Sequence, residues 1–156
     1  MSKTKLWEIS KLSCKQDLST SAKIILSQRL DQLLSSINLY FAEINIEKLH
    51  QVRISLRRMR YPMELFVKCF NRKKYLSFYK IISSLQNSSG EIRDLDLFKM
   101  NLSKYFKKDK FKAENVIAEN LDIKKNKLQS NFKLELMEFI HGKELKEFGK
   151  LINHRL

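Results

Sequence analysis

The sequence predicts an all-α protein, and three observations support this fold class. Glycine and proline are scarce, because the 156 residues include 3 glycines and 1 proline, where average composition would give about 19. Apolar residues make up 43 % of the chain, and they recur at helical spacing. A sandwich or barrel needs a tight turn roughly every ten residues, and the residues that form such turns are missing. The apolar content also argues against a wholly disordered chain.

Two helices are expected before residue 70. The first starts near Thr20, and its apolar residues at steps of three and four are Ile24, Ile25, Leu26, Leu30, Leu33, Leu34, Ile37 and Tyr40. The second runs from about Ile46 towards Phe70, after Asn45 as a candidate N-cap. This second helix carries the residues on which the functional hypothesis depends.

The rest of the chain is predicted to form further helices. A third covers 73–86, and the polar run 87–90 then breaks the pattern. Ser88 followed by Glu91 has the spacing of a capping box, so a fourth helix is expected from there to about Phe106. After a charged break at 107–110, a Lys/Glu-rich helix is expected over 111–140, ended by Gly142 and followed by a short terminal helix. The prediction is an antiparallel four-helix bundle with additional C-terminal helices and no second domain.

Charge and cysteine usage limit the functions to consider. The formal net charge is +14 and the pI is near 9.8, which suits a polyanionic partner. Cys14 and Cys69 lie far apart without zinc-site spacing, so we expect two reduced thiols. No signal peptide is recognisable, and apolar residues never run together for the roughly 18 positions that a membrane span needs. We therefore expect a cytoplasmic protein that uses no cofactor and no membrane.

The most informative segment is 49–61. Four of the chain's eight arginines lie between positions 53 and 60, and no acidic residue occurs from 48 to 63, although Glu47 and Glu64 lie immediately outside. On a helix that turns 100° per residue, an arc of about 80° holds the basic side chains His50, Arg53, Arg57 and Arg60. A separate arc beside it holds a core stripe of Val52, Leu56, Met59, Met63 and Phe66. Arg58 points elsewhere, so we expect an ordinary surface residue that contributes much less.

A row of like charges one turn apart destabilises a helix by a few tenths of a kcal/mol per pair. Arginine offers a planar fork that matches phosphate oxygens and keeps its charge at all relevant pH values. The row therefore favours an anion supplied from outside. Two alternatives stay open at this point: carboxylates of neighbouring helices neutralise the row, or it is a solvated face.

Two motifs resemble the CHAD family, the conserved histidine α-helical domains. The first is His50-x-x-Arg53-x-x-x-Arg57-Arg58-x-Arg60. The second is Leu85 followed by Gly90-x-x-Arg93-Asp94-Leu95-Asp96-Leu97, about forty residues later, as in the family. The resemblance covers about 20–106, and 111–156 is similar only in being basic and helical. Taken together, 1–156 would be a single CHAD-like domain.

The resemblance implies a helical bundle that binds inorganic polyphosphate in a basic groove. Carried over to this chain, the residues that line the groove would be His50, Arg53, Arg57 and Arg60, with Arg93 joining from the fourth helix. Asp94 and Asp96 would orient basic side chains rather than bind a metal, since two acids alone form a weak metal site. No catalytic or metal-binding residue is implied.

The chain departs from the family pattern in two places. The family usually has two related four-helix bundles, whereas this sequence encodes one clear copy, so we expect a homodimer. Alternatively, the Lys-rich C-terminal helix takes the place of the missing bundle. Pro62 falls inside the motif helix, where it should either kink or break the helix or mark a restart with proline in the first turn.

Two other function classes compete with a polyphosphate-binding module. A nucleic-acid-binding helical protein is the first, because +14 suits any polyanion. The second is a phosphoanhydride hydrolase, for which the sequence offers no acidic metal cluster, P-loop or nucleophile–base pair. His50 as a phosphate-accepting nucleophile lacks a carboxylate partner nearby in sequence, so a ligand contact is preferred. The lysines at 107, 108, 110, 124, 125 and 127 are expected to form a solvated face.

Overall fold

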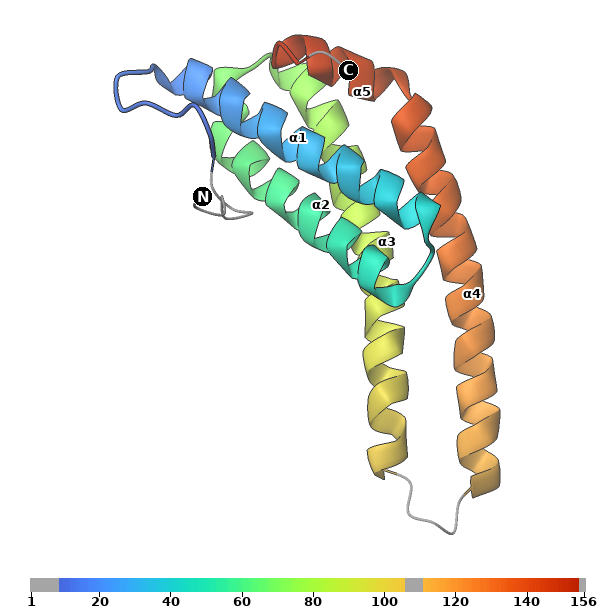
Figure 1. The fold of residues 1–156 in the computed structure, drawn as a ribbon. Helices are drawn as coiled ribbons and strands as arrows, with labels where there is room; N and C mark the ends of the chain where they lie inside the picture. Colours follow the sequence, from blue (N-terminus) through green and yellow to red (C-terminus); the bar gives the residue numbers. More distant parts are fainter. Residues whose placement is uncertain (1–8, 106–110, 155–156) are drawn as a thin grey trace.

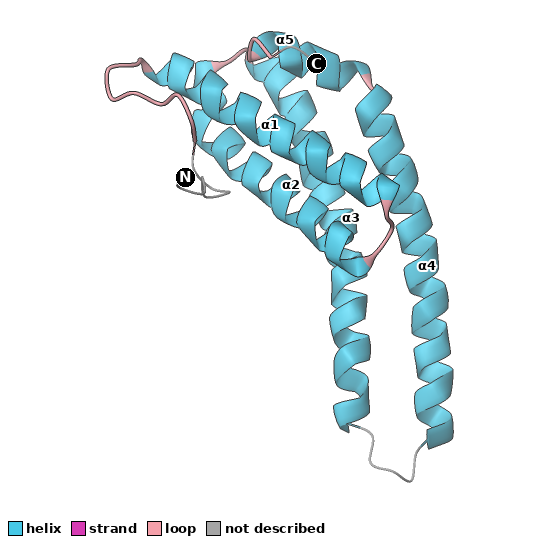
Figure 2. Ribbon diagram, in the orientation of Figure 1, coloured by secondary structure: helices cyan, strands magenta, loops and turns pink. Residues whose placement is uncertain are grey.

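The protein is all-α, as the sequence predicts. The computed structural model describes residues 9–105 and 111–154, and every regular element within these ranges is helical (Figure 2). In chain order the elements are α1 (Leu18–Ala42), α2 (Ile46–Phe66), the short 3-10 helix η1 (Val67–Cys69), α3 (Arg72–Tyr105), α4 (Phe111–His141) and α5 (Lys143–Leu151).

Side-chain caps fix the starts of α1 and α2. The carboxylate of Asp17 accepts hydrogen bonds from the backbone N–H of Thr20 at 2.8 Å and from its hydroxyl at 2.6 Å. The side chain of Asn45 accepts from the backbone N–H of Lys48 at 2.8 Å, which confirms the predicted cap of the second helix. Each cap satisfies a donor that the first turn of a helix leaves without an internal partner.

α2 continues through Pro62 without a break or a restart and ends at Phe66. Proline removes the N–H that would bond the carbonyl of Arg58 one turn earlier. Met63 and Phe66, which lie beyond the proline, are both buried in the core, and their packing keeps the chain helical past the lost bond. The last residues of the predicted helix form η1 instead.

The break expected at 87–90 is wrong, because α3 is one continuous helix of 34 residues. Gly90 does not adopt a positive φ, and the Ser89 hydroxyl donates a 2.8 Å hydrogen bond to the carbonyl of Gln86 one turn earlier. A single buried stripe passes through the segment at steps of four, three and four: Leu85, Ser89, Ile92 and Asp96. Tertiary packing therefore outweighs the weak helix propensity of this polar run.

The chain up to residue 105 thus supplies three long helices, and α4 is the fourth. α1 packs against α2, α2 against α3, and α3 against both α4 and α5. Figure 1 shows α3 extending beyond the first turn of α2 and running beside α4 as a two-helix hairpin. The rings of Phe78 and Phe148 stack at 4.0 Å between centroids and tie α5 to α3. Gly142 separates α4 from α5 and is the N-cap of α5.

Candidate anion-binding face

α2 turns its apolar side inward and its basic side outward. Val52, Leu56, Met59 and Met63 are fully buried in the core that α1 and α3 complete. These are residues of the predicted core stripe. Because one side of the helix is committed to the core, the side chains of the neighbouring arc lie towards the surface of the protein.

A hollow of about 360 Å³ lies on the outer side of α2, and its lining residues are Arg53, Ile54, Arg57, Arg58 and Tyr61. Within 9–105 and 111–154, no carboxylate forms an ion pair with any of these three arginines. The Nε of Arg53 is buried and has no hydrogen-bond partner among the described residues. Three guanidinium groups around one hollow form an arrangement that suits the oxygens of a phosphate chain.

Arg58 differs from the expectation, because it is half-buried and shares the hollow with Arg53 and Arg57. It also lines a second hollow of about 380 Å³ between α1 and α2. Arg29 of α1 lines neither hollow, but burial lowers its pKa and the nearby charge of Arg58 lowers it further. Sequence reasoning missed Arg29, since only the packing of α1 on α2 brings it near this face.

Tyr61 is the second residue that sequence reasoning missed. Its ring lies 5.5 Å from the guanidinium carbon of Arg57 and 5.5 Å from that of Arg60. At these distances the electron-rich face of an aromatic ring attracts a cation. The spacing was a usable signal, because a tyrosine four residues after an arginine lies beside it on a helix.

Arg60 has a carboxylate beside it. Its Nε lies 3.0 Å from Oε1 of Glu64 one turn later, and the Tyr79 hydroxyl of α3 donates a 2.8 Å hydrogen bond to the same oxygen. The hydrogen bond to Glu64 is the largest cause that raises the pKa of Tyr79. Glu64 belongs to α2 itself, so this contact is not the neutralisation by neighbouring helices that the sequence left open, and it reaches the row only at its end.

The remaining two predicted site residues do not line the hollow. His50 lies one turn before Arg53, half-buried, and its Nδ1 is buried without a hydrogen-bond partner in the described part of the chain. Arg93 comes from α3. A 2.9 Å hydrogen bond from the Tyr75 hydroxyl to the Met63 carbonyl joins the start of α3 to the end of α2. Arg93 is half-buried on α3, 18 residues beyond Tyr75.

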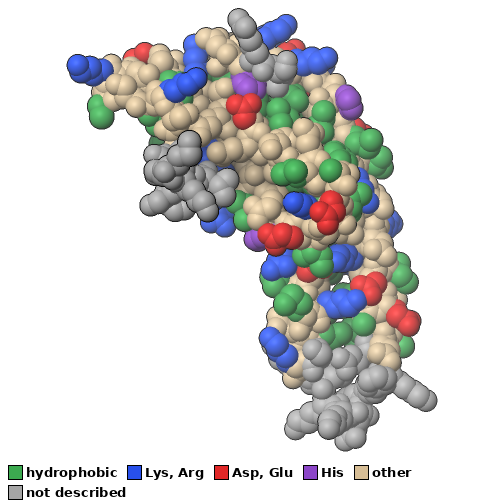
Figure 3. Space-filling model, viewed as in Figure 1, with side chains coloured by type: hydrophobic (Ala, Val, Ile, Leu, Met, Phe, Trp, Pro, Cys, Tyr) green, Lys and Arg blue, Asp and Glu red, His purple; other side chains and the backbone are tan. Residues whose placement is uncertain are grey.

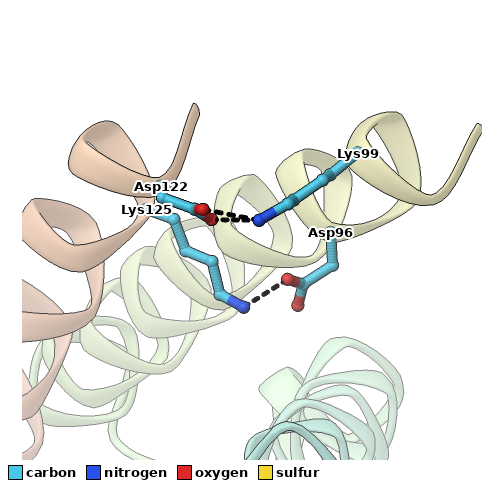
Figure 4. Close-up of polar contacts among 4 residues, drawn as sticks. All are labelled: Asp96, Lys99, Asp122 and Lys125. Atoms are coloured by element: carbon cyan, nitrogen blue, oxygen red, sulfur yellow. Dashed lines mark hydrogen bonds and ion pairs between the residues drawn. The ribbon is translucent and has the colours of Figure 1, made fainter. Parts of the chain in front are cut away.

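Asp96 is buried and forms an ion pair with Lys125 of α4 at 2.5 Å, beside a second pair between Lys99 and Asp122 (Figure 4). The side chain of Asp96 is 7 % exposed and that of Lys125 is 18 % exposed. Asp96 therefore orients a basic side chain, as expected, although that side chain holds α3 to α4. Asp94 is exposed. Figure 3 shows acidic and basic side chains mixed along this hairpin.

Of the lysines predicted to form a solvated face, Lys124 and Lys127 are exposed. Lys125 is not, because it reaches Asp96, and positions 107, 108 and 110 lie outside the described residues. Over the described ranges, His, Cys, Asp and Glu side chains do not gather in threes as a metal site would require. In the same ranges, no helix is long and apolar enough to span a membrane.

The fold and this face define an all-α protein in which one helix, α2, places three arginines around a hollow. The CHAD domain model matches residues 4–151, so the chain belongs to the CHAD-domain family. This family is associated with polyphosphate binding, and its domain is in general a binding module rather than a catalytic one. Neither a curated protein nor a solved structure matches the chain significantly.

Proposed function

We propose that the protein binds inorganic polyphosphate through the outer face of α2 and acts without catalysis. The observation that carries this proposal is the hollow that Arg53, Arg57 and Arg58 line together. Like-charged side chains that share one hollow repel each other, and an anion that bridges them removes that repulsion. Phosphate oxygens accept the paired N–H groups of guanidinium with short charge-assisted hydrogen bonds.

The length of the face favours a chain of phosphates over a single one. From Arg53 to Tyr61 the helix advances about 12 Å at 1.5 Å per residue, enough for several consecutive phosphates. A long chain touches all three arginines at once, whereas orthophosphate touches one or two. Affinity is therefore expected to rise steeply with chain length and to fall with salt as counterions are released.

The other predicted residues extend this contact in the proposal. His50 lies one turn before the hollow and Arg60 one turn after Arg57 on the same helix. Arg93 adds a positive charge from α3, the helix that packs against α2. A polyphosphate chain that follows the axis of α2 passes these side chains in order, so we assign all three to the edges of the binding face.

Calorimetric titration with long-chain polyphosphate tests the proposal. The wild-type protein should bind it, and Arg53→Ala and Arg57→Ala should each weaken binding at least about tenfold, the usual effect of losing one charge-assisted contact. Lys127→Ala, which removes one exposed charge from α4, is the matched control and should change affinity less than twofold. Equal losses for all three variants would mean that net charge alone explains binding.

Nucleic acid is the competing ligand, because the same arginines would bind its backbone phosphates. Competition separates the two partners: long polyphosphate should displace DNA or RNA at low concentration, and the reverse displacement should need a large excess. The converse result would favour the nucleic-acid function. Phosphate release over hours, with and without Mg²⁺, would instead favour the hydrolase.

A further inference from the structure

Glu64 lies against Arg60, at the end of the predicted arginine row of α2. At 100° per residue it falls inside the same arc as Arg53, Arg57 and Arg60. It is the first residue after the acid-free stretch 48–63. A negative charge in this place opposes the binding of a polyanion. The contacts of Glu64 therefore determine how it affects binding at the α2 face.

The carboxylate of Glu64 has two partners: a hydrogen-bond donor on α3 and a guanidinium on α2. The Tyr79 hydroxyl donates a 2.8 Å hydrogen bond to Oε1 from the neighbouring helix α3. Nε of Arg60 lies 3.0 Å from the same oxygen but makes no well-directed hydrogen bond to it or to any other described atom. The side chain of Arg60 is 23 % exposed and that of Glu64 is 45 % exposed.

The ion pair between Arg60 and Glu64 is therefore the weaker of these two contacts. An i,i+4 pair whose carboxylate is 45 % exposed contributes little, because water screens it and both side chains lose freedom. A phosphate oxygen that forms a directed, charge-assisted bond with the same guanidinium outcompetes this contact. The bond from Tyr79 does not depend on Arg60, so it keeps the carboxylate near the guanidinium after the pair opens.

We propose that Glu64, tethered by Tyr79, is a built-in competitor that occupies Arg60 and lowers the affinity of the α2 face for its polyanion. This inference rests on the proposed function, since it describes how that same face is restrained. In the free protein Arg60 faces Glu64, and in the complex it faces a phosphate. The affinity that is measured then includes the cost of opening the pair.

The experiment measures binding of long-chain polyphosphate at several salt concentrations for the wild type, Glu64→Gln and Tyr79→Phe. Glu64→Gln should strengthen binding about fivefold, the upper range for an exposed ion pair. The salt dependence of log Kd should steepen by up to roughly 0.7–0.9, because in the wild-type complex the tethered carboxylate still offsets the charge with which Arg60 neutralises one phosphate. Tyr79→Phe keeps every charge and removes the tether, so it should strengthen binding about twofold.

The matched control is Glu147→Gln on α5, which raises the net charge by the same unit at an exposed position. It should change affinity less than twofold and leave the salt dependence unaltered. In an Arg60→Ala background, Glu64→Gln should no longer steepen the salt dependence, because the released arginine is absent.

Two results separate this inference from the proposed function. If wild type binds polyphosphate and Glu64→Gln behaves like Glu147→Gln, Glu64 does not compete with the polyanion, while the proposed binding function of α2 is unaffected. If wild type and Glu64→Gln both fail to bind polyphosphate, the proposed function falls, and the competitor falls with it. Circular dichroism of each variant checks that the helices are intact.

Discussion

Arg53 and Arg58 line the same hollow on α2, although helical spacing separates them by about 140° around the axis. The hollow lies between them, over Ile54 and beside Tyr61. The cationic face is therefore broader than the arc predicted from the sequence. Its centre lies on the side of α2 that is turned away from the core, and its edge reaches the groove with α1.

Arg58→Ala should therefore weaken polyphosphate binding about as much as Arg57→Ala, roughly tenfold for one charge-assisted contact. The sequence alone predicted a much smaller effect for Arg58, on the reasoning that it points elsewhere. Calorimetric titration of the two variants beside Lys127→Ala decides between these expectations. An effect of Arg58→Ala no greater than that of Lys127→Ala would exclude it from the binding face.

Lys125→Met should destabilise the fold by about 1–3 kcal/mol, because it leaves the buried carboxylate of Asp96 without its partner. Lys127→Met, two residues later and exposed, should change the free energy of unfolding by less than about 0.5 kcal/mol. Urea denaturation followed by circular dichroism measures both. Equal stability of the two variants would show that the Asp96–Lys125 pair contributes nothing.

Stability in acid should depend on the Asp17 cap. Hydrogen bonds from the Thr20 hydroxyl and then its backbone N–H lower the pKa of Asp17. A carboxyl group whose pKa is lower in the folded state stabilises the fold above its unfolded pKa, near 3.9. That contribution disappears as the pH falls through the folded pKa. Asp17→Asn should thus lower Tm at pH 7 more than at pH 2.5, and an equal decrease at both would contradict this.

Self-association stays a prediction, and the α3–α4 hairpin offers a surface for it. Phe98, Met100, Val116 and Ile123 are each more than half exposed there. Val116, Ile123 and Leu134 fall within about 20° of one another on α4, opposite Lys125. Light scattering at micromolar concentration should give about twice 18.6 kDa, and Ile123→Glu should reduce this mass. A mass of 18.6 kDa at every concentration would rule out the dimer.

The parts of the fold that depend on local chemistry could be predicted from the sequence. Asn45 caps α2 because its side chain bonds a nearby N–H, and the core stripe of α2 follows from periodicity alone. The continuity of α3 could not be predicted, because burial of Ser89 and Ile92 by other helices overrides a local break signal. α2 likewise passes Pro62 because residues on both sides of it are packed into the core.

The candidate site divides in the same way. Arg53 and Arg57 were found because charge and spacing identify them within one helix. Arg29 requires the packing of α1 against α2, which no pattern in a single helix contains. The sequence shows Glu64 immediately outside the acid-free stretch, and extending the same arc by one turn places it on the arginine side of the helix. The hydrogen bond between Tyr79 and Glu64 could not be predicted from the sequence, because that contact joins two helices.

The central claim is that a phosphate chain lies on the outer face of α2. A crystal structure of the protein with a defined polyphosphate oligomer tests it most directly. The account predicts phosphate oxygens within about 3 Å of the guanidinium nitrogens of Arg53, Arg57 and Arg58, the range of charge-assisted hydrogen bonds. A chain bound elsewhere, for instance along the lysines of α4, with these three arginines untouched, would contradict it.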